Sequence, residues 1–348
     1  MKKELFSEEC SEEFIYPLFA NALEEDGLLG YYKEYKYESD SITVTARGNV
    51  GHATVRNERF NAVGRLIILT SKKDLNMNFF EEYINNNVKV HIESTGVPQL
   101  TAPSLKINKL HYPSLLEQNQ IANFLGVLNK KMELLEKKHE SYVSFKKYLM
   151  QQIFTQKLRF NFNDDWKHVN LIDICEIGKG FTPSTSKSEF WDGNIDWLSI
   201  ADMNQGKYIN YSTKKITEEG TQNKEIIKRG TLLMSFKLTI GKLGILNKDM
   251  YTNEAICNFK LKNDKVLTEY LYYYLNSINI MKYGSQAAKG ITLNNDTLST
   301  IPILLPSISE QKKIVEVLSI IDKKIDQMSI ELEICIKFKK GLLQQMFV

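Results

Sequence analysis

The sequence predicts an α+β protein in which two pseudo-symmetric α/β domains are separated by two long antiparallel helices that form a coiled coil. Three observations predict this fold. One long segment occurs twice, each copy carries an apolar heptad seam, and the same order of strand and helix patterns precedes each copy. With 348 residues, 43% of them hydrophobic, the chain is long enough for two or three such units.

The first globular unit is expected over residues 1–113. Its clearest pattern is "TVTARGNVGHATV" from Thr43, which is typical of two strands around a tight glycine turn. An apolar run "GRLIIL", a short helical pattern "FFEEYINN" and a loop "STGVPQ" follow it. These elements predict a small α+β domain.

The first long helix is expected over residues 114–155, where the repeat lies. The stretch from Glu117 to Phe154 matches the stretch from Glu310 to Phe347 without a gap, and 14 of the 38 pairs are identical. Because chance would give roughly two or three identities, the match indicates a duplication. The identities gather at the ends, in "EQ" and in "FKK.L.QQ.F", which suggests junctions that both copies must make.

Apolar residues recur in each copy at alternating steps of four and three, as in a coiled-coil seam. Two units related by a two-fold axis would place the helices antiparallel, each burying its stripe against the other. Three polar residues interrupt the seam, His139, Lys146 and Lys339, and their side chains are expected to extend into solvent. The seam residues are Ile121, Leu125, Leu128, Met132, Leu135, Ile314, Leu318, Ile321, Ile325 and Met328.

A linker and the second globular unit are expected over residues 156–306, and the second long helix over 307–348. The turn pattern returns as "LLMSFKLTIGKLGI" from Leu232, which pairs Gly51 with Gly241. The patterns "AICNFKL", "TEYLYYYLN" and "SQAAKG" then follow in the same order as in the first unit. The stretch from Trp166 to Pro306 is longer than that from Met1 to Pro113, so the first unit is expected to be short at its start.

Composition restricts the class of protein. The net charge is +3, but residues 1–40 sum to −7, so the remainder carries +10, a modest excess that could face a polyanion. The four cysteines are scattered singly, which favours reduced thiols over disulfides or a zinc site. No signal-like start or apolar stretch of about 18 residues occurs, so a cytoplasmic location is expected.

Motifs for catalysis are absent from the sequence. A DNA methyltransferase needs a Pro-Pro-aromatic motif, and no Pro-Pro occurs. No P-loop and no H-E-x-x-H occur, and the five histidines never take metal-ligand spacing. We therefore expect a chain that is not an enzyme, with no metal and no cofactor of its own.

Six stretches together resemble the DNA-specificity subunit of type I restriction-modification systems. They are the two "P-S-x-x-E-Q" starts, the two "FKK-x-L-x-QQ-x-F" ends, "LRF" at Leu158–Phe160 leading to Trp166, and "GFTPSTSKSEFWDGNIDWLSIADM" from Gly180. The resemblance covers nearly the whole chain from about residue 27. The first domain departs from the pattern, since it begins without the usual Trp-containing start and first strand.

This resemblance implies a non-catalytic subunit of a restriction and methylation complex. Each target recognition domain would read one half of a bipartite, asymmetric site in double-stranded DNA. The helices would set the spacer and dock two methyltransferase subunits, and restriction/translocase subunits would join for cleavage. S-adenosylmethionine, ATP and Mg²⁺ would be bound by those partners. Three alternatives stay open: the specificity subunit of a related type IIB/IIG-like methyltransferase-nuclease, a coiled-coil protein–protein adaptor, and a nuclease in its own right.

Candidate DNA-binding residues are polar or cationic side chains in the turns and loops of both domains, because Lys and Arg contact phosphates and loops reach base edges. The pairing of Arg47 with Lys237 and of His52 with Lys242 favours the glycine turn over other loops. For each residue, an ordinary solvated surface side chain remains the alternative. The candidates are Arg47, Asn49, His52, Arg56 and Gln99 in the first unit, and Lys179, Thr182, Ser184, Lys237, Thr239, Lys242, Gln286 and Lys289 in the second.

Overall fold

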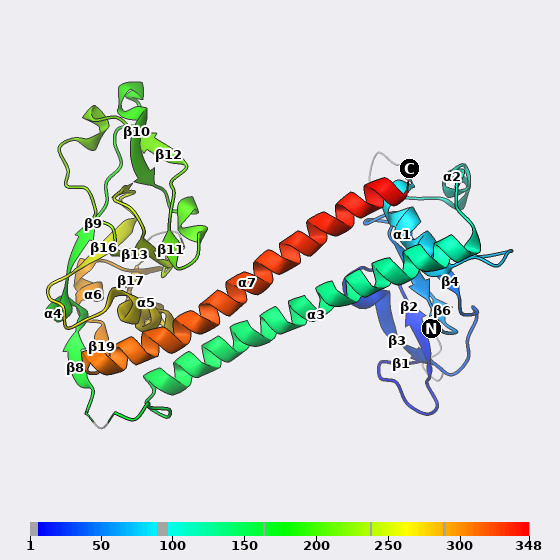
Figure 1. Ribbon diagram of the computed structural model, residues 1–348, viewed down its shortest axis with the longest axis horizontal. Coiled ribbons are helices and arrows are strands. Elements are labelled where there is room, and N and C mark those ends of the chain that lie inside the picture. Colours follow the sequence, from blue (N-terminus) through cyan, green and yellow to red (C-terminus); the bar gives the residue numbers. More distant parts are fainter. Residues whose placement is uncertain (1–5, 89–96, 163, 237–238, 288–289, 348) are drawn as a thin grey trace. The chain divides into compact units, whose positions relative to one another are not determined.

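The structure, a computed structural model, describes residues 6–88, 97–162, 164–236, 239–287 and 290–347 (Figure 1). For residues 285–287 and 290–292 it describes the backbone. The chain forms two compact units, one made of Met1–Lys137 with Ile330–Val348 and the other of Lys138–Ser329. Each unit contains one domain and the adjoining parts of both long helices. No helix in the described ranges is long and apolar enough to cross a membrane.

The first unit contains two small sheets, with strand orders β5-β4-β7 and β1-β3-β2-β6. Its strands are β1 (Phe6–Ser7), β2 (Tyr16–Phe19), β3 (Leu28–Tyr32), β4 (Ser41–Thr45), β5 (Ala53–Arg56), β6 (Asn61–Ala62) and β7 (Leu66–Thr70). Its short helices are α1 (Met77–Asn87) and α2 (Ala102–Lys106). The core joins the β4 sheet to α1, with Ile42, Val44 and Phe79 fully buried in one cluster.

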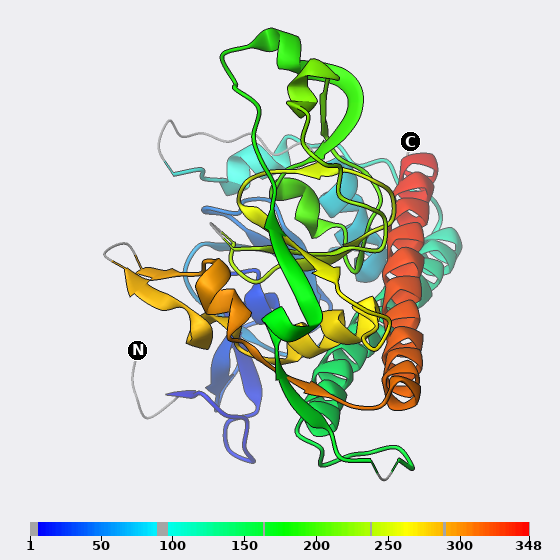
Figure 2. The same cartoon turned by 90° about the vertical axis from the view of Figure 1, so that its left-hand side faces the viewer.

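The second unit contains a five-stranded sheet, β11-β14-β13-β16-β9, a three-stranded sheet, β12-β10-β15, and the strand pairs β19-β8 and β17-β18. Its strands are β8 (Lys167–Asn170), β9 (Cys175–Lys179), β10 (Trp191–Leu198), β11 (Tyr208–Ile209), β12 (Lys214–Ile216), β13 (Leu232–Ser235), β14 (Leu243–Leu246), β15 (Tyr251–Thr252), β16 (Ile256–Leu261), β17 (Ser285–Ala287), β18 (Gly290–Thr292) and β19 (Pro302–Leu305). Its short helices are α4 (Leu171–Ile174), α5 (Thr268–Ser277) and α6 (Asn295–Ser299). The β17-β18 hairpin projects from the domain (Figure 2).

The two domains repeat the same sheet in the same register. Strand β4 pairs with β5 and β7 as β13 pairs with β14 and β16, and one constant offset along the chain relates every paired residue to its equivalent. For example, Val44 lies opposite Ala53 and Ile67, and Met234 lies opposite Leu243 and Cys257. The predicted pairing of Gly51 with Gly241 is thereby confirmed.

A second pair of equivalent strands tests where the first domain is shorter than the second. The parallel pair Leu18 with Asn61 corresponds to Trp197 with Tyr251, and the chain between the two paired strands is longer in the second domain. Part of the difference in length is therefore an insertion inside the second domain, so the expectation that all of it lies at the start of the first domain is wrong. Loops between strands tolerate such insertions.

The two predicted long helices are present as α3 (Leu115–Phe154) and α7 (Ile308–Met346). Within each unit a segment of α3 lies beside a segment of α7 that runs in the opposite direction, as Figure 1 shows. Lys131 pairs with Glu331 at 2.9 Å in the first unit, and Lys146 with Asp322 at 2.5 Å in the second. The ten seam residues are buried, except Met132, Leu135 and Ile325, which are half-buried.

The lysines that interrupt the seam do not extend into solvent as expected. Half-buried Lys146 pairs with Asp322 of α7, and its equivalent Lys339 pairs with buried Glu82 of α1 at 2.8 Å. The carboxylate comes from the long helix in one unit and from the domain in the other. A charge taken partly out of water requires such a partner, whichever element supplies it.

The identical ends of the repeat have the same contacts in both units. Buried Gln118 accepts a hydrogen bond from the Asn76 amide, just before α1, and buried Gln311 accepts one from the Leu267 amide, just before α5. At the other end, Phe347 packs on the Phe79 and Tyr83 rings.

Phe154 packs likewise on Tyr270 and Tyr274, the equivalent positions of α5. Each domain therefore holds the start of one long helix and the end of the other. This contact pattern requires the two helices to be antiparallel within each unit.

Candidate nucleic-acid interface

Two loops that are closed by the same hydrogen bonds join the paired strands β4-β5 and β13-β14. In the first, Gly51 donates its amide to the Thr45 carbonyl at 2.7 Å, and the His52 amide donates to Thr45 Oγ1 at 3.0 Å. In the second, the Gly241 amide donates to the Ser235 carbonyl at 2.8 Å, and the Lys242 amide to Ser235 Oγ at 3.1 Å. A hydroxyl residue at the first position thus closes both loops.

The glycines are required by the backbone conformation of these loops. Gly51 and Gly241 have φ angles of 89° and 88°, in the left-handed region that disfavours residues with a Cβ atom. Val50 and Ile240, just before them, pack against the domain cores. Each loop is therefore held at both ends.

In the first domain the loop presents Arg47 and Asn49 to solvent, with His52 at its end. The Asn21 side chain holds the loop backbone: its Oδ1 accepts from the Ala46 amide at 2.7 Å, and its Nδ2 donates to the Arg47 carbonyl at 2.6 Å. The Arg47 side chain takes no part in these hydrogen bonds. Exposed cationic and amide groups on a rigid loop can donate hydrogen bonds to phosphates and base edges.

Sequence reasoning missed Arg65. Its Nη1 donates to Oε1 of the candidate Gln99 at 2.6 Å, and its carbonyl accepts from the Ala46 amide at 3.0 Å. Gln99 also forms a backbone bridge with Arg47. Arg65 therefore belongs with Arg47 and Gln99, although the only signal in the sequence is its place just before an apolar strand.

The candidate Arg56 is assigned wrongly to the surface. Its side chain is 6% exposed, its Nε donates to Thr43 Oγ1 at 2.9 Å, and its guanidinium lies 3.6 Å from the centre of the Phe19 ring. Burial lowers the pKa of Arg56 below its ordinary value, against the opposing effect of Asp26. Because its donors face the inside of the domain, Arg56 holds two sheets together.

In the second domain, Thr239 is exposed and Lys242 donates to the side chain of Asn204, another residue that sequence reasoning missed. Exposed Lys179 at the end of β9 lies 5.6 Å from the centre of the Phe236 ring, at the base of the loop. The structure thus brings Lys179, Thr239 and Lys242 to one region. Lys237 and Lys289 lie outside the described residues.

The remaining candidates lie on two other segments. Half-buried Thr182 accepts from Asn253 Nδ2 at 3.1 Å, and exposed Ser184 accepts at its carbonyl from Trp191 Nε1 at 3.1 Å. Gln286 lies in strand β17 of the projecting hairpin (Figure 2). Among the described residues, no group of three or more His, Cys, Asp or Glu side chains could hold a metal ion.

A family model described as "Type I restriction modification DNA specificity domain" matches residues 1–141 and, a second time, residues 163–335. This chain belongs to that family. The two matches correspond to the two domains, each with part of the long helix that follows it. The resemblance read from the repeat and its flanking motifs is thereby confirmed.

Relatives in this family are named specificity subunits. The chain is 32% identical over 191 residues to the type I restriction enzyme MjaIX specificity subunit of Methanocaldococcus jannaschii. This alignment covers 53% of this chain and 44% of the relative. It is 27% identical over 288 residues to the MjaVIII subunit of the same organism, covering 74% of this chain and 65% of the relative. The matches thus span less than two thirds of either relative.

Solved structures have the same fold. The S subunit of a type I restriction-modification system from M. genitalium aligns with a TM-score of 0.66 at 17% identity, covering all of this chain (100%) and 91% of that one. A chain from a study of complex assembly and conformational transition in the type I R-M system aligns with a TM-score of 0.59 at 14% identity, covering 95% and 91%. This chain therefore shares the fold of these two structures.

Proposed function

We propose that this chain is the DNA-specificity subunit of a type I restriction-modification system, each domain reading one half of a bipartite, asymmetric site. One observation carries the proposal. The loops that follow β4 and β13 have the same backbone hydrogen bonds but different outward side chains. Two loops with the same backbone hydrogen bonds and different side chains suit a protein whose two domains contact DNA in the same way and read two different sequences.

Affinity and specificity would come from different groups on these loops. Arg47, Arg65, Lys179 and Lys242 would neutralise phosphates, and that contribution weakens with added salt. Amide and hydroxyl groups such as those of Asn49 and Thr239 would contact base edges, which carry the sequence information. Different bases are then expected at the two half-sites.

The long helices supply the surface proposed for partner subunits. Phe145 and Phe338 occupy equivalent positions of the repeat, are identical, and are 50% and 53% exposed. Val127 and Ile320, also equivalent, are exposed as well. Apolar side chains exposed at matched positions favour two copies of one partner.

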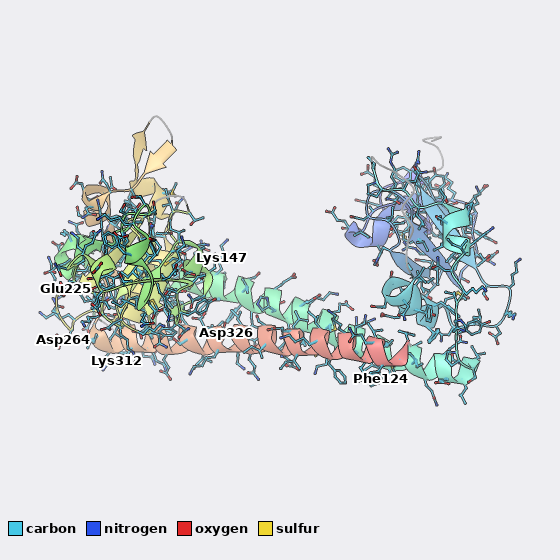
Figure 3. The ribbon with its side chains drawn as sticks, turned by 90° about the horizontal axis from the view of Figure 1, so that it is seen from above. Phe124, Lys147, Glu225, Asp264, Lys312 and Asp326 are labelled. Atoms are coloured by element: carbon cyan, nitrogen blue, oxygen red, sulfur yellow. The ribbon has the colours of Figure 1, made fainter. Side chains whose placement is uncertain are left out.

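We assign that partner as the methyltransferase subunit, with restriction/translocase subunits joining for cleavage. S-adenosylmethionine, ATP and Mg²⁺ would be bound by those partners, and this chain would contribute positioning and not catalysis. Phe124, 47% exposed and labelled on α3 in Figure 3, would lie within the docking surface in the first unit.

Comparison of host methylomes with and without the gene tests the proposal. Deletion is expected to remove one bipartite adenine-methylation motif with unlike halves. An unchanged methylome in a strain that expresses both this chain and a methyltransferase would overturn the proposal, and so would the loss of a palindromic motif.

The loop assignment is tested on the DNA site so defined, with the methyltransferase partner present. Arg47→Ala is expected to weaken binding by about tenfold and to lower the slope of affinity against salt by about one unit. Lys72→Ala is the control, because Lys72 follows the end of β7 remote from the loop and is also exposed. Equal losses of DNA affinity in the two variants would contradict the assignment. DNA binding that does not depend on salt would indicate a protein–protein adaptor.

A further inference from the structure

The second domain contains a cavity over the face of its five-stranded sheet, at strands β9 and β16. The volume of the cavity is about 450 Å³, within the range of about 300–1,000 Å³ that is typical of small-molecule sites. Strand β15 and residues 224–228 complete its lining. All of these segments belong to the second unit, so the cavity lies within one compact body.

Strand pairing places the side chain of Asn258 in the floor of this cavity. Asn258 lies opposite Gly178 of β9 and opposite Leu233 of β13, and residues paired in this way point to the same face of a sheet. A Cβ atom added to Gly178 would lie 2.6 Å from Asn258 Oδ1, so the amide occupies the space that a larger residue would fill. Leu233 is fully buried, and the Asn258 amide therefore has an apolar neighbour.

Two polar groups of the cavity lining have no hydrogen-bond partner among the described residues. Thr252 is 1% exposed, and its Oγ1 is buried without a partner. The half-buried side chain of Asn258 likewise forms no hydrogen bond with any described residue. A polar group taken out of water without a partner costs free energy. Both groups are therefore available to a ligand.

The fold itself does not require polar side chains at these two positions. In the first domain, the strand pairing puts Ile68 at the position equivalent to Asn258 and Ala62 at the position equivalent to Thr252. Apolar residues thus form the same backbone pairs there. A ligand explains the polar pair of the second domain better than a structural role does.

Aromatic and apolar side chains form the walls of the cavity. The rings of Phe181 and Tyr251 have centres 5.5 Å apart, and Ile226 lines the cavity with them. The Phe181 amide donates to the Thr252 carbonyl at 2.8 Å, and the Tyr251 hydroxyl donates to the Lys224 carbonyl at 2.9 Å. Walls fixed in this way suit a flat ring.

Cationic side chains outnumber acidic ones around the cavity. Lys228 pairs with Asp249 at 2.9 Å, whereas exposed Lys224 and Lys260 form no ion pair with a described residue. Lys260 lies two positions after Asn258 in β16, so both side chains point to the same face. A phosphate could therefore bind beside the Asn258 amide. The charged residues of the lining are Lys179, Lys224, Lys228, Lys260, Glu176 and Glu225.

We propose that this cavity binds a nucleotide with an adenine base. An asparagine amide offers one donor and one acceptor, which match N7 and the N6 amino group of adenine, whereas guanine presents two acceptors at that edge. Phe181 and Tyr251 would contact the ring, and Lys224 and Lys260 would contact the phosphate. A free nucleotide and an unstacked nucleotide of DNA have this chemistry in common.

The inference does not depend on the proposed function, because nucleotide binding is measured without DNA and without partner subunits. Calorimetric titration of the full-length chain with dAMP is the test. We expect one site with a Kd below about 1 mM, and binding of dGMP that is weaker by about tenfold.

Asn258→Leu and Thr252→Val separate a ligand site from a structural role. Each should weaken dAMP binding by about tenfold or more. Each should also leave the melting temperature of the free chain unchanged or raise it, because an unpartnered polar group is removed. Side chains with a structural role would lower the melting temperature when they are replaced.

Lys260→Gln tests the phosphate contact at an exposed position. It should weaken dAMP binding by about fivefold and leave the binding of deoxyadenosine unchanged. Lys282→Gln is the control, because Lys282 is exposed and lies outside the cavity lining.

A single-stranded oligodeoxynucleotide that contains adenine identifies the source of the nucleotide. Displacement of dAMP would assign the cavity to nucleotides of DNA, and lack of displacement would assign it to free nucleotides; both results support the site. Four results would overturn the proposal: no saturable dAMP binding, equal binding of inorganic phosphate, binding that neither Asn258→Leu nor Thr252→Val weakens, and a lower melting temperature in both variants.

Discussion

At the scale of single residues, two glutamates of identical sequence context have opposite environments. Glu310 is fully buried and accepts three hydrogen bonds, two from Arg159 and one from Trp166, while Glu117 is exposed. Both are followed by a glutamine that makes the same buried contact in each unit. The difference arises entirely from what else is packed beside the helix start.

We expect Glu310→Ala to lower the free energy of unfolding of the second unit by about 2–4 kcal/mol, because the donors of Arg159 and Trp166 lose their acceptor inside the protein. Glu117→Ala should change stability by no more than about 0.5 kcal/mol. Denaturant titration followed by fluorescence reports the second unit, since all three tryptophans, Trp166, Trp191 and Trp197, lie in it.

Circular dichroism in the same titration follows both units and serves as the control for the first. A similar loss of stability in the two variants would contradict the assignment of Glu310 as a buried acceptor. Glu310→Gln is the milder variant, since an amide oxygen still accepts one hydrogen bond.

The cysteines give a second residue-scale prediction. Cys10 is exposed, and Cys175, Cys257 and Cys335 are buried. Burial raises the pKa of Cys175 to about 12, so its thiol stays protonated at pH 8. A thiol reagent at pH 8 should therefore modify about one thiol per native chain and all four in denaturant.

The Cys10→Ser variant checks this assignment, since its native form should not react. Rapid modification of that variant would show that one of the three other thiols is accessible in the folded protein.

At the scale of elements, the loops that follow β4 and β13 are closed in the same way. Thr45 and Ser235 each close a loop of the same length through a hydroxyl, and a glycine with positive φ ends it. The outward residues can change without altering this frame. Under the proposed function, such a frame would let the two domains diverge in the bases they contact.

We expect Gly241→Ala to destabilise the second unit by about 1 kcal/mol and to weaken DNA binding. An added Cβ there meets no atom within 4 Å, so the cost comes from the φ of 88° alone. Gly126→Ala, inside α3 and equally free of contacts, should instead stabilise by about 0.5–1 kcal/mol. Thermal unfolding of both variants measures whether each change lowers or raises stability. A stabilising Gly241→Ala would contradict this account.

At the scale of the whole molecule, each domain holds the start of one long helix and the end of the other, through Gln118 and Phe347 in one unit and Gln311 and Phe154 in the other. Identical residues make these contacts, which explains why the repeat keeps its two ends while its middle diverges. Under the proposed function, the helices therefore act as a spacer whose length is independent of the reading loops.

We expect insertion of seven residues into both α3 and α7, at Lys137 and Ser329, to lengthen the gap between half-sites and leave their sequences unchanged. Seven helical residues add about 10 Å, or about three base pairs at 3.4 Å each. Methylation-motif analysis measures the spacer directly. A change in either half-site, with the gap unchanged, would contradict the spacer role.

Much of this architecture is readable from the residues. The gapless repeat, the seam and the glycine turns predicted the helices, the order of the elements in each half and the paired loops, because these are local patterns or copies of one another. Arg56 was assigned wrongly and Arg65 was missed, since a charged residue in a strand or before it carries no sign of which way its side chain points. The ion pairs of Lys146 and Lys339 were not predicted either, because their partners come from different elements.

Duplication, helix length and loop equivalence follow from the order of the amino acids, since periodicity and backbone preference act over neighbouring residues. Only the folded chain decides which copies of a residue are buried, paired or left open. Glu117 and Glu310 are the same residue in the same motif, yet one faces solvent and the other bonds Arg159 and Trp166. The physical reason is that burial depends on segments distant in the chain, and these are absent, among the described residues, beside one helix start and present beside the other.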